Sequence, residues 1–145
     1  MRKKFIDFAL CAMLFALCGP ASAQQPTKVP RIGYLGGTSL PARTAAFQQG
    51  LRELGYVEGK NIAIEYRYAE GKFDRYPALA AELVRLKVDV IVSAGSTATR
   101  AVKEATSTIP IVMSQDSDPV GNGFVASLAR PGGNITGLST LAPEI

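Results

Sequence analysis

The feature that most constrains the fold is an alternation of short apolar segments with longer segments of helical periodicity. Val88–Val92 and Ile109–Met113 are almost uninterrupted apolar runs, which is typical of strands buried on both faces of a parallel sheet. Arg31–Leu35 and Ile135–Leu138 are short segments that also predict strands. Asn61–Tyr68 alternates apolar and polar residues, which predicts a half-exposed strand.

Between these segments, apolar residues recur every three or four positions, as in amphipathic helices. The expected helices are Ala42–Leu54, Arg75–Lys87, Thr97–Thr106 and Gly121–Ala129. Strands interleaved with helices in this way predict an α/β fold, with a doubly wound, mostly parallel five-stranded sheet and helices on both faces. Right-handed crossovers then bring the carboxyl ends of the strands to one edge, where ligands bind in open α/β sheets.

The N-terminal segment has the layout of a secretory signal peptide. A basic start is followed by an apolar run, Phe8–Leu17, and by a small-residue pattern that ends at Ala23. We predict cleavage after Ala23, so that residues 1–23 are the signal peptide and residues 24–30, QQPTKVP, are a flexible leader. The alternative is a lipoprotein signal with an acylated Cys18, although the preceding Leu17 is bulky where a small residue is expected.

The chain that remains is expected to be exported, and not to span the membrane. The apolar run is shorter than the roughly 20 residues that cross a bilayer, and no later segment is long enough. About 120 residues remain, which suits one compact domain with its own core. We therefore treat residues 31–145 as one α/β domain.

The composition excludes several kinds of chemistry. The sequence contains no histidine, and both of its cysteines lie in residues 1–23. A Ser-His-Asp triad, a thiolate nucleophile and nearly all zinc sites are thereby excluded. Neither a dinucleotide-binding nor a P-loop motif is present, and scattered charges of both signs give no surface for nucleic acid. We expect no cofactor, no metal and no nucleic-acid partner.

Three predicted loops follow strands at the carboxyl edge and carry the candidate ligand-binding residues. They are GGTSLP with Gly37, Thr38 and Ser39, AGSTA with Gly95, Ser96 and Thr97, and SQDSDPVG with Asp116 and Asp118. Glycines allow a ligand to approach the backbone, and the exposed N–H groups at the start of a helix attract anions.

Each loop also has a purely structural interpretation, because the same residues cap helices. Ser39, Ser96 or Thr97 can accept a hydrogen bond from the first turn of the next helix. Asp118, which precedes a proline, fits the same role. Asp116 is freer and could bind the ammonium group of a ligand.

No residue is predicted to be catalytic. A catalytic serine would need a lysine base, and the nearest basic side chains, Arg100 and Lys103, fall inside the following helix. Tyr66, Tyr68 and Tyr76 are interpreted as packing residues of the sheet and helix.

Longer blocks of the sequence are similar to a known family. LRELGYVEGKNIAIEYR, STIPIVM and LARPGGNITG resemble the substrate-binding proteins of ABC transporters, typified by the tryptophan-binding receptor. The resemblance runs without a gap from Arg31 to Ile145. It implies a type I periplasmic binding protein, in which two α/β lobes joined by a hinge close over a small molecule.

The resemblance also implies a periplasmic location. The implied partners are the permease and ATPase subunits of an importer.

The resemblance makes the three loops the rim of a ligand cleft, and some members of the family bind aromatic amino acids. Family members are roughly twice as long as this chain, so residues 31–145 resemble the N-terminal lobe, and the second lobe is missing. A lone lobe would bury much less of a ligand than a closed pocket, so weak affinity or none is expected. Two alternatives remain open: an exported α/β enzyme that uses Asp116 and Asp118 with a metal, and a periplasmic sensory binding module.

Overall fold

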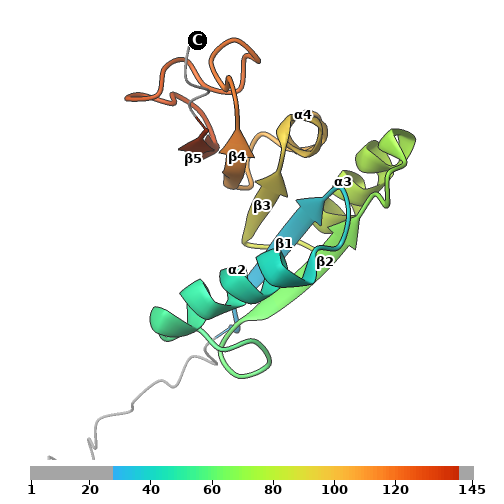
Figure 1. Ribbon diagram of the computed structural model, residues 1–145, viewed down its shortest axis with the longest axis vertical. Helices are drawn as coiled ribbons and strands as arrows, with labels where there is room; N and C mark the ends of the chain where they lie inside the picture. The colour runs from blue at the N-terminus through green and yellow to red at the C-terminus, as the bar shows by residue number, and fades with distance from the viewer. Residues whose placement is uncertain (1–27, 141–145) are drawn as a thin grey trace, which may run out of the picture.

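Five short strands pair side by side to form the predicted sheet (Figure 1). The structure is a computed structural model that describes residues 28–140. The strands are β1 (Arg31–Gly36), β2 (Ala63–Tyr68), β3 (Val90–Ala94), β4 (Ile111–Asp116) and β5 (Ile135–Ser139). Their order is β2-β1-β3-β4-β5, and every pairing is parallel. The predicted fold class is confirmed, and the described sheet is entirely parallel. The predicted signal peptide, its cleavage at Ala23 and residues 24–27 of the leader lie outside the described residues.

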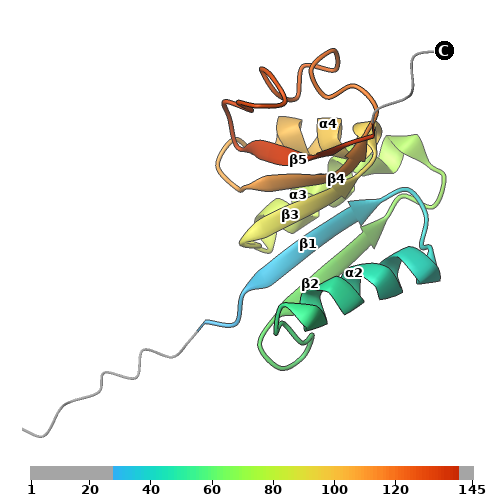
Figure 2. The ribbon, with the colours of Figure 1, turned by 60° about the vertical axis from the view of Figure 1, so that its left-hand side comes forward.

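Helices cover both faces of the sheet, as predicted. The helical elements are α2 (Pro41–Glu53), the short 3-10 helix η2 (Phe73–Arg75), α3 (Tyr76–Arg85) and α4 (Ser96–Ala105). Figure 2 shows α2 on one face, over β1 and β2, and α3 and α4 on the other. A proline in the first turn of α2 suits the start of a helix, where its missing N–H costs nothing. Just after α2, Gly55 has a φ of +87°, a conformation common at helix ends.

The side chains of β1 alternate between two hydrophobic clusters. Leu35 points to the larger cluster, where the buried faces of α3 and α4 pack on the sheet through residues such as Leu83 and Val102. Ile32 and Tyr34 point to the smaller cluster, beneath α2. Two-sided burial explains why the central strands read as continuous apolar runs.

The predicted helix over Gly121–Ala129 is wrong. Residues 117–134 form turns without regular structure, on the way from β4 to β5. Gly123 has a φ of +69°, and the Asp118 carboxylate accepts a hydrogen bond from the Gly121 amide at 2.7 Å, which closes a tight turn. The segment still contributes to the core, because Phe124 and Val125 are buried in the larger cluster. The apolar spacing therefore correctly indicated that this segment is buried. Its backbone forms turns and not a helix because of the glycines and aspartates.

Candidate functional site

The carboxyl ends of all the described strands lie along one edge of the sheet. β1 has β2 on one side and β3 on the other, so the chain changes its direction of travel across the sheet between these two strands. In open α/β sheets a ligand-binding crevice lies outside the carboxyl ends at such a switch point. The loops that follow β1, β3 and β4 are neighbours at this edge, as the sequence predicts.

A cavity of about 380 Å³ opens beside the switch point. Its aromatic wall consists of Tyr34 from β1, Tyr68 from β2 and Tyr76 from α3. The ring centroids of Tyr34 and Tyr68 are 6.0 Å apart, and the hydroxyls of Tyr68 and Thr44 lie 3.2 Å apart, within hydrogen-bond distance. This packing fixes the rings, and the wall is suited to contact a planar apolar group.

Apart from Leu40, the rest of the lining is small or polar. Gly37 and Thr38 contribute from the loop after β1, and Ala94 contributes from the end of β3. A Cβ atom on Gly37 would lie 3.2 Å from the Tyr76 hydroxyl, so glycine leaves room here that a side chain would fill. Arg43, in the first turn of α2, is the one charged side chain among the described residues that line the cavity.

The predicted binding residues lie at the same edge but not in one cavity. Gly37 and Thr38 line the 380 Å³ cavity, whereas Ser39 does not. Thr97 lines a separate hollow of about 130 Å³ between α3 and α4, together with Phe73.

Neither α2 nor α4 has the side-chain cap that the structural interpretation expects. Leu40 is the N-cap residue of α2, so Ser39 is not the cap. Helix α4 begins at Ser96, and its N-cap is Gly95 at a φ of 94°, a conformation that favours glycine. No side chain caps either helix, so the capping interpretation of Ser39, Ser96 and Thr97 is wrong.

Other hydroxyl groups near the end of β3 form a buried hydrogen bond. The hydroxyl oxygens of Ser93 and Thr99 are 2.8 Å apart, and the Thr99 hydroxyl also donates to the Gly95 carbonyl at 3.1 Å. Both residues are fully buried. Because buried polar groups need partners, this pair joins the first turns of α4 to β3 and positions the loop between them.

This pair makes a prediction about stability. Thr99→Val and Ser93→Ala are each expected to lower the free energy of unfolding by about 1–3 kcal/mol. Each substitution removes one buried hydroxyl and takes a hydrogen-bond partner from the other. The double variant is expected to lose less than the sum, since no hydroxyl is then left without its partner. Urea unfolding of the four proteins measures the coupling. Additive losses would show that the two hydroxyls do not interact.

Asp116 and Asp118 do not line the cavity, and both organise the turn after β4. Asp116 is only 3% exposed. Its Oδ1 accepts hydrogen bonds from the Asp118 amide at 2.9 Å and from the Asn122 side chain at 3.0 Å. Its Oδ2 is buried and has no hydrogen-bond partner among the described residues. The expectation that Asp116 is freer than Asp118 is therefore wrong, and Asp118 caps a turn in place of a helix.

Most of the cavity is formed by residues that sequence reasoning did not assign to a site. Tyr68 and Tyr76 do pack, as interpreted, but they also line the cavity. Tyr34, Arg43 and Thr44 are absent from the predicted binding residues. The available signal was positional: Tyr34 lies near the end of an apolar strand at the functional edge, and Arg43 falls in the first turn of the next helix.

Burial raises the pKa of three tyrosines above the ordinary value of 10.0. For Tyr34, burial is the main cause, the neighbouring Tyr68 adds to the rise, and the positive charge of Arg43 opposes it. For Tyr66, burial outweighs the opposing effect of a hydrogen bond from Gln48. For Tyr76, burial is the cause.

These shifts predict alkaline destabilisation. In the unfolded chain the tyrosines lose their protons near pH 10, about their ordinary pKa, while the folded chain retains them to higher pH. The unfolded state then binds fewer protons, so the stability that is fully present below about pH 10 falls as the pH rises further. The urea concentration at the midpoint of unfolding should therefore decrease as the pH is raised above about 10. The decrease should be less steep in the Tyr34→Phe variant. Equal slopes for Tyr34→Phe and the unaltered chain would contradict the assignment to Tyr34.

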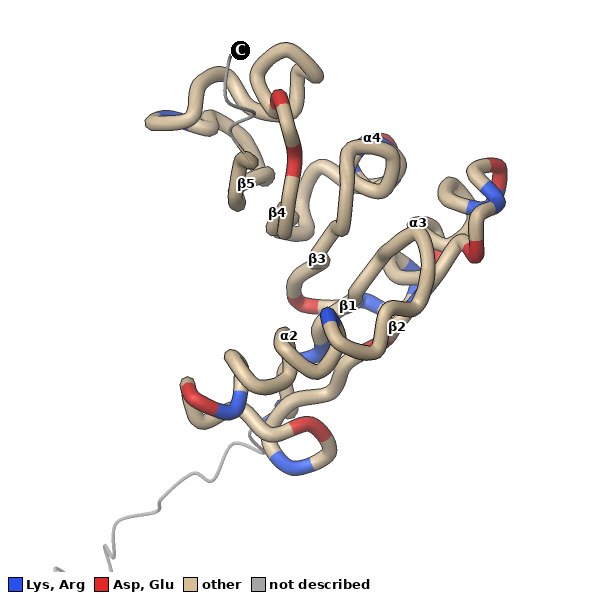
Figure 3. Tube along the Cα trace, in the orientation of Figure 1, with Lys and Arg blue, Asp and Glu red and all other residues tan. Residues whose placement is uncertain are grey.

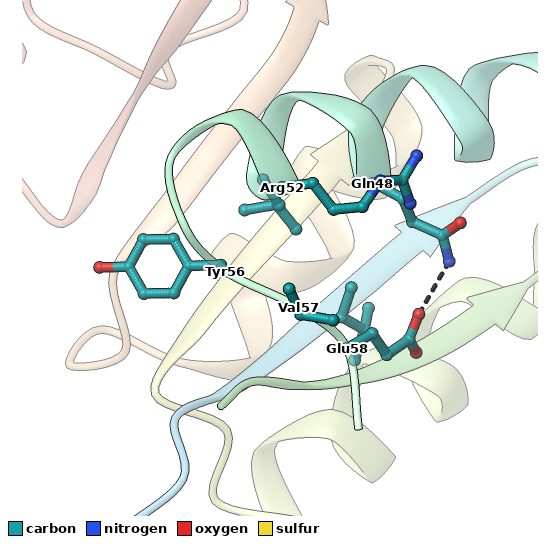
Figure 4. Close-up of a pocket in the computed structure, with 7 residues that line it drawn as sticks. Gln48, Arg52, Tyr56, Val57 and Glu58 are labelled. Carbon is teal, nitrogen blue, oxygen red and sulfur yellow. Dashed lines mark hydrogen bonds between the residues drawn. The ribbon is translucent and has the colours of Figure 1, made fainter. Parts of the chain in front are cut away.

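A second, smaller cavity of about 120 Å³ lies at the other end of α2, next to the loop that leads to β2. Figure 4 shows Gln48 of α2 hydrogen-bonded to Glu58 of that loop, at 2.8 Å. The Gln48 amide also donates to the Tyr66 hydroxyl at 3.1 Å. This cavity contains none of the predicted binding residues, and its polar side chains hold the loop against the helix.

The charged residues of the described chain give little support to other kinds of site. Figure 3 shows both signs scattered along residues 28–140. Within this range no group of three or more acidic, histidine or cysteine side chains is placed to hold a metal ion. No helix of the described part is both long and apolar enough to cross a bilayer.

The fold and the cavity together define a class of protein. A parallel sheet of this order, with a small aromatic-walled cavity at the switch point, has the architecture of α/β lobes that bind small ligands. Residues 28–144 match the family described as ABC transporter substrate binding protein, and the chain belongs to this family. The family indicated by the sequence blocks is therefore confirmed.

Individual relatives carry more specific names. The chain is 36% identical over 101 residues to the tyrosine-binding protein of Clostridioides difficile (strain R20291), covering 70% of this chain and 29% of that protein. It is similar to the structure of an ABC domain from Streptococcus pneumonia in complex with L-Trp, with a TM-score of 0.70 and 31% identity over 76% of this chain and 38% of the other.

A third relative is the ligand-free, open structure of a substrate binding protein with adhesive properties from Clostridium difficile. Its TM-score is 0.74 and its identity 30%, over 79% of this chain and 40% of the other. The chain thus spans less than half the length of each of these relatives. None of the three is described as an enzyme.

Proposed function

We propose that this chain is the first lobe of the periplasmic substrate-binding component of an ABC importer. It binds a small solute, with aromatic amino acids favoured, in a cleft that a second lobe closes. The permease and ATPase subunits of the importer are its partners. Residues 1–23 direct export as a signal peptide that is removed after Ala23, and the released protein is periplasmic and does not span the membrane.

The observation that carries this proposal is the tyrosine-walled cavity at the switch point. Its volume of about 380 Å³ falls at the lower end of the range for small-molecule pockets. Tyr34, Tyr68 and Tyr76 offer an apolar surface with polar tips, which suits the ring of an aromatic side chain. The names of two relatives, a tyrosine-binding protein and a domain in complex with L-Trp, agree with this ligand class.

The remaining predicted residues surround the cavity in this proposal. Gly37 and Thr38 line the cavity itself, and Ser39, Gly95, Ser96 and Thr97 extend its rim along the sheet edge. The turn held by Asp116 and Asp118 continues that edge beyond β4. Small side chains at these positions let a second lobe approach the backbone closely.

The proposal is tested by following backbone amide resonances of the exported chain while amino acids are added. L-Tyrosine, L-tryptophan and L-phenylalanine are expected to shift the signals of the loop after β1 and of the start of α2. L-Alanine and L-glutamate serve as comparison ligands and are expected to leave these signals in place. Resonances are the suitable readout because half a cleft binds weakly, and weak binding still moves them.

Two matched variants locate the site. Tyr68→Ala removes a ring from the cavity wall and is expected to weaken binding at least tenfold, in line with the loss of a buried aromatic contact. Tyr56→Ala removes an exposed ring next to the smaller cavity and is expected to bind normally. The proposal would be overturned if aliphatic and aromatic amino acids bound equally well, or if Tyr56→Ala were the variant that lost binding.

A further inference from the structure

We propose that Arg43 is the anion-binding residue of the tyrosine-walled cavity, so that this lobe selects aromatic carboxylates by their carboxylate and not by their ammonium group. The inference rests on the proposed function and makes it more specific. It assigns a ligand class to the lobe that includes aromatic amino acids and also their desamino analogues, and that excludes the corresponding amines and amides.

The first step is the charge of the lining. Arg43 alone carries a formal charge among the described residues around the cavity, and no carboxylate is present in that lining. A ligand carboxylate therefore meets one complementary charge. A ligand ammonium meets none, and it is repelled by the arginine when both groups enter the cavity.

The second step is that Arg43 has no competing partner in the described part of the chain. The ion pairs found there are Lys28–Asp89, Arg31–Glu65, Arg67–Glu65 and Arg67–Glu82. No acidic residue lies in the first turn of α2, and no side chain caps that turn. The guanidinium is thus free to take a carboxylate in the bidentate geometry that arginine favours, and the dipole of α2 adds to the attraction.

The third step places the guanidinium beside the aromatic wall. Arg43 and Tyr34 line the same cavity, and burial raises the pKa of Tyr34 against the smaller, opposing effect of the positive charge of Arg43. Tyr34 in turn contacts the Tyr68 ring at a centroid distance of 6.0 Å, and Thr44, the residue after Arg43, lies within hydrogen-bond distance of Tyr68. Cationic and aromatic surfaces are therefore adjacent, which matches a ring joined by a short chain to a carboxylate.

The test titrates the chain with L-tyrosine, its desamino analogue and its decarboxylated amine, tyramine, following amide resonances. The desamino analogue is expected to bind at least as tightly as L-tyrosine, and tyramine is expected not to bind up to about 10 mM, near the weakest affinity the method resolves. Arg43→Gln is expected to weaken the binding of both carboxylate ligands by about tenfold, because the lost hydrogen bonds are charge-assisted but partly screened by solvent. Arg43→Lys should retain part of the affinity, because it keeps the charge but loses the bidentate geometry.

The matched control is Arg52→Gln, which removes the same charge from the other end of α2. It lies next to the smaller cavity and is expected to leave the affinities unchanged. Both arginines are exposed, so the variants are expected to fold, and unchanged resonances in the sheet verify this. Arg43→Lys provides the comparison if Arg43→Gln does not fold.

The outcomes separate the two proposals. If L-tyrosine binds Arg43→Gln as well as the unaltered chain, or if tyramine binds as well as L-tyrosine, the role of Arg43 is overturned and the proposed function stands. If the desamino analogue binds through Arg43 but no aromatic amino acid binds, the anion site stands and the amino-acid ligand class is overturned. If none of the probes binds up to about 10 mM, both are overturned.

Discussion

Replacing Gly137 with alanine is expected to detach β5 from the sheet and to lower the free energy of unfolding by about 3 kcal/mol or more. Gly137 pairs with Met113 of β4, and its φ is +142°. A Cβ atom here would lie 2.6 Å from the Met113 backbone nitrogen and closer still to its carbonyl oxygen. Because both atoms belong to the main chain of a paired strand, no rotation of a side chain relieves the overlap.

A matched glycine tests whether the cost comes from this close approach. Gly50 lies within α2, and a Cβ atom added to it would have no neighbour within 4 Å. Gly50→Ala is therefore expected to raise the stability by about 0.5–1 kcal/mol through helix propensity. Urea unfolding of the three proteins gives the comparison. If Gly137→Ala unfolded at the midpoint of the unaltered chain, the tight pairing of β5 with β4 would be contradicted.

Leu83→Ala is expected to cost about 2–5 kcal/mol, the range for a leucine removed from a well-packed core. Leu83 is fully buried and lies in α3 directly over β1. A Cβ atom added to Gly33 of that strand would be 3.1 Å from the Leu83 methyl groups. The glycine lets the leucine approach the sheet backbone, so truncation leaves a void that the rigid sheet cannot close.

The control for Leu83 is another leucine with the opposite environment. Leu54 follows α2 and is 76% exposed, so Leu54→Ala is expected to change the stability by about 0.5 kcal/mol or less. Thermal and urea unfolding of both variants measures the difference. Equal losses would show that the cluster around Leu83 is not packed as described.

The sheet was predictable because burial on both faces restricts the residues that β3 and β4 can contain. β3 and the first half of β4 are largely apolar, and such runs are typical of parallel strands enclosed by helices. The carboxyl edge and its three loops follow from the handedness of the crossovers. The segment before β5 was not predictable in the same way. Its apolar residues have helical spacing, yet Gly121, Gly123 and Asp118 stabilise turns that compete with the helix, and Leu128 is 58% exposed.

The cavity was harder to predict than the edge on which it lies. It requires Tyr34, Tyr68 and Tyr76 to converge from two strands and a helix, and no local pattern encodes that convergence. The hydroxyl residues near β3 were misleading for a related reason. Short polar side chains suit caps, rims and buried pairs equally, and the hydrogen bond between Ser93 and Thr99 depends on how α4 lies over the sheet.

The parallel pairing of every described strand also bears on how fast the chain folds. Parallel neighbours cannot be joined by a hairpin, so each pair forms only after an intervening helix or a long turn has been brought round. That loss of chain entropy precedes any gain from the contacts, so folding is expected to be slower than that of a helical bundle of the same length. β1 lies between β2 and β3, so its second edge stays unpaired until β3 has docked. For a polypeptide exported as proposed, slow folding gives the chain time to cross the membrane before it folds.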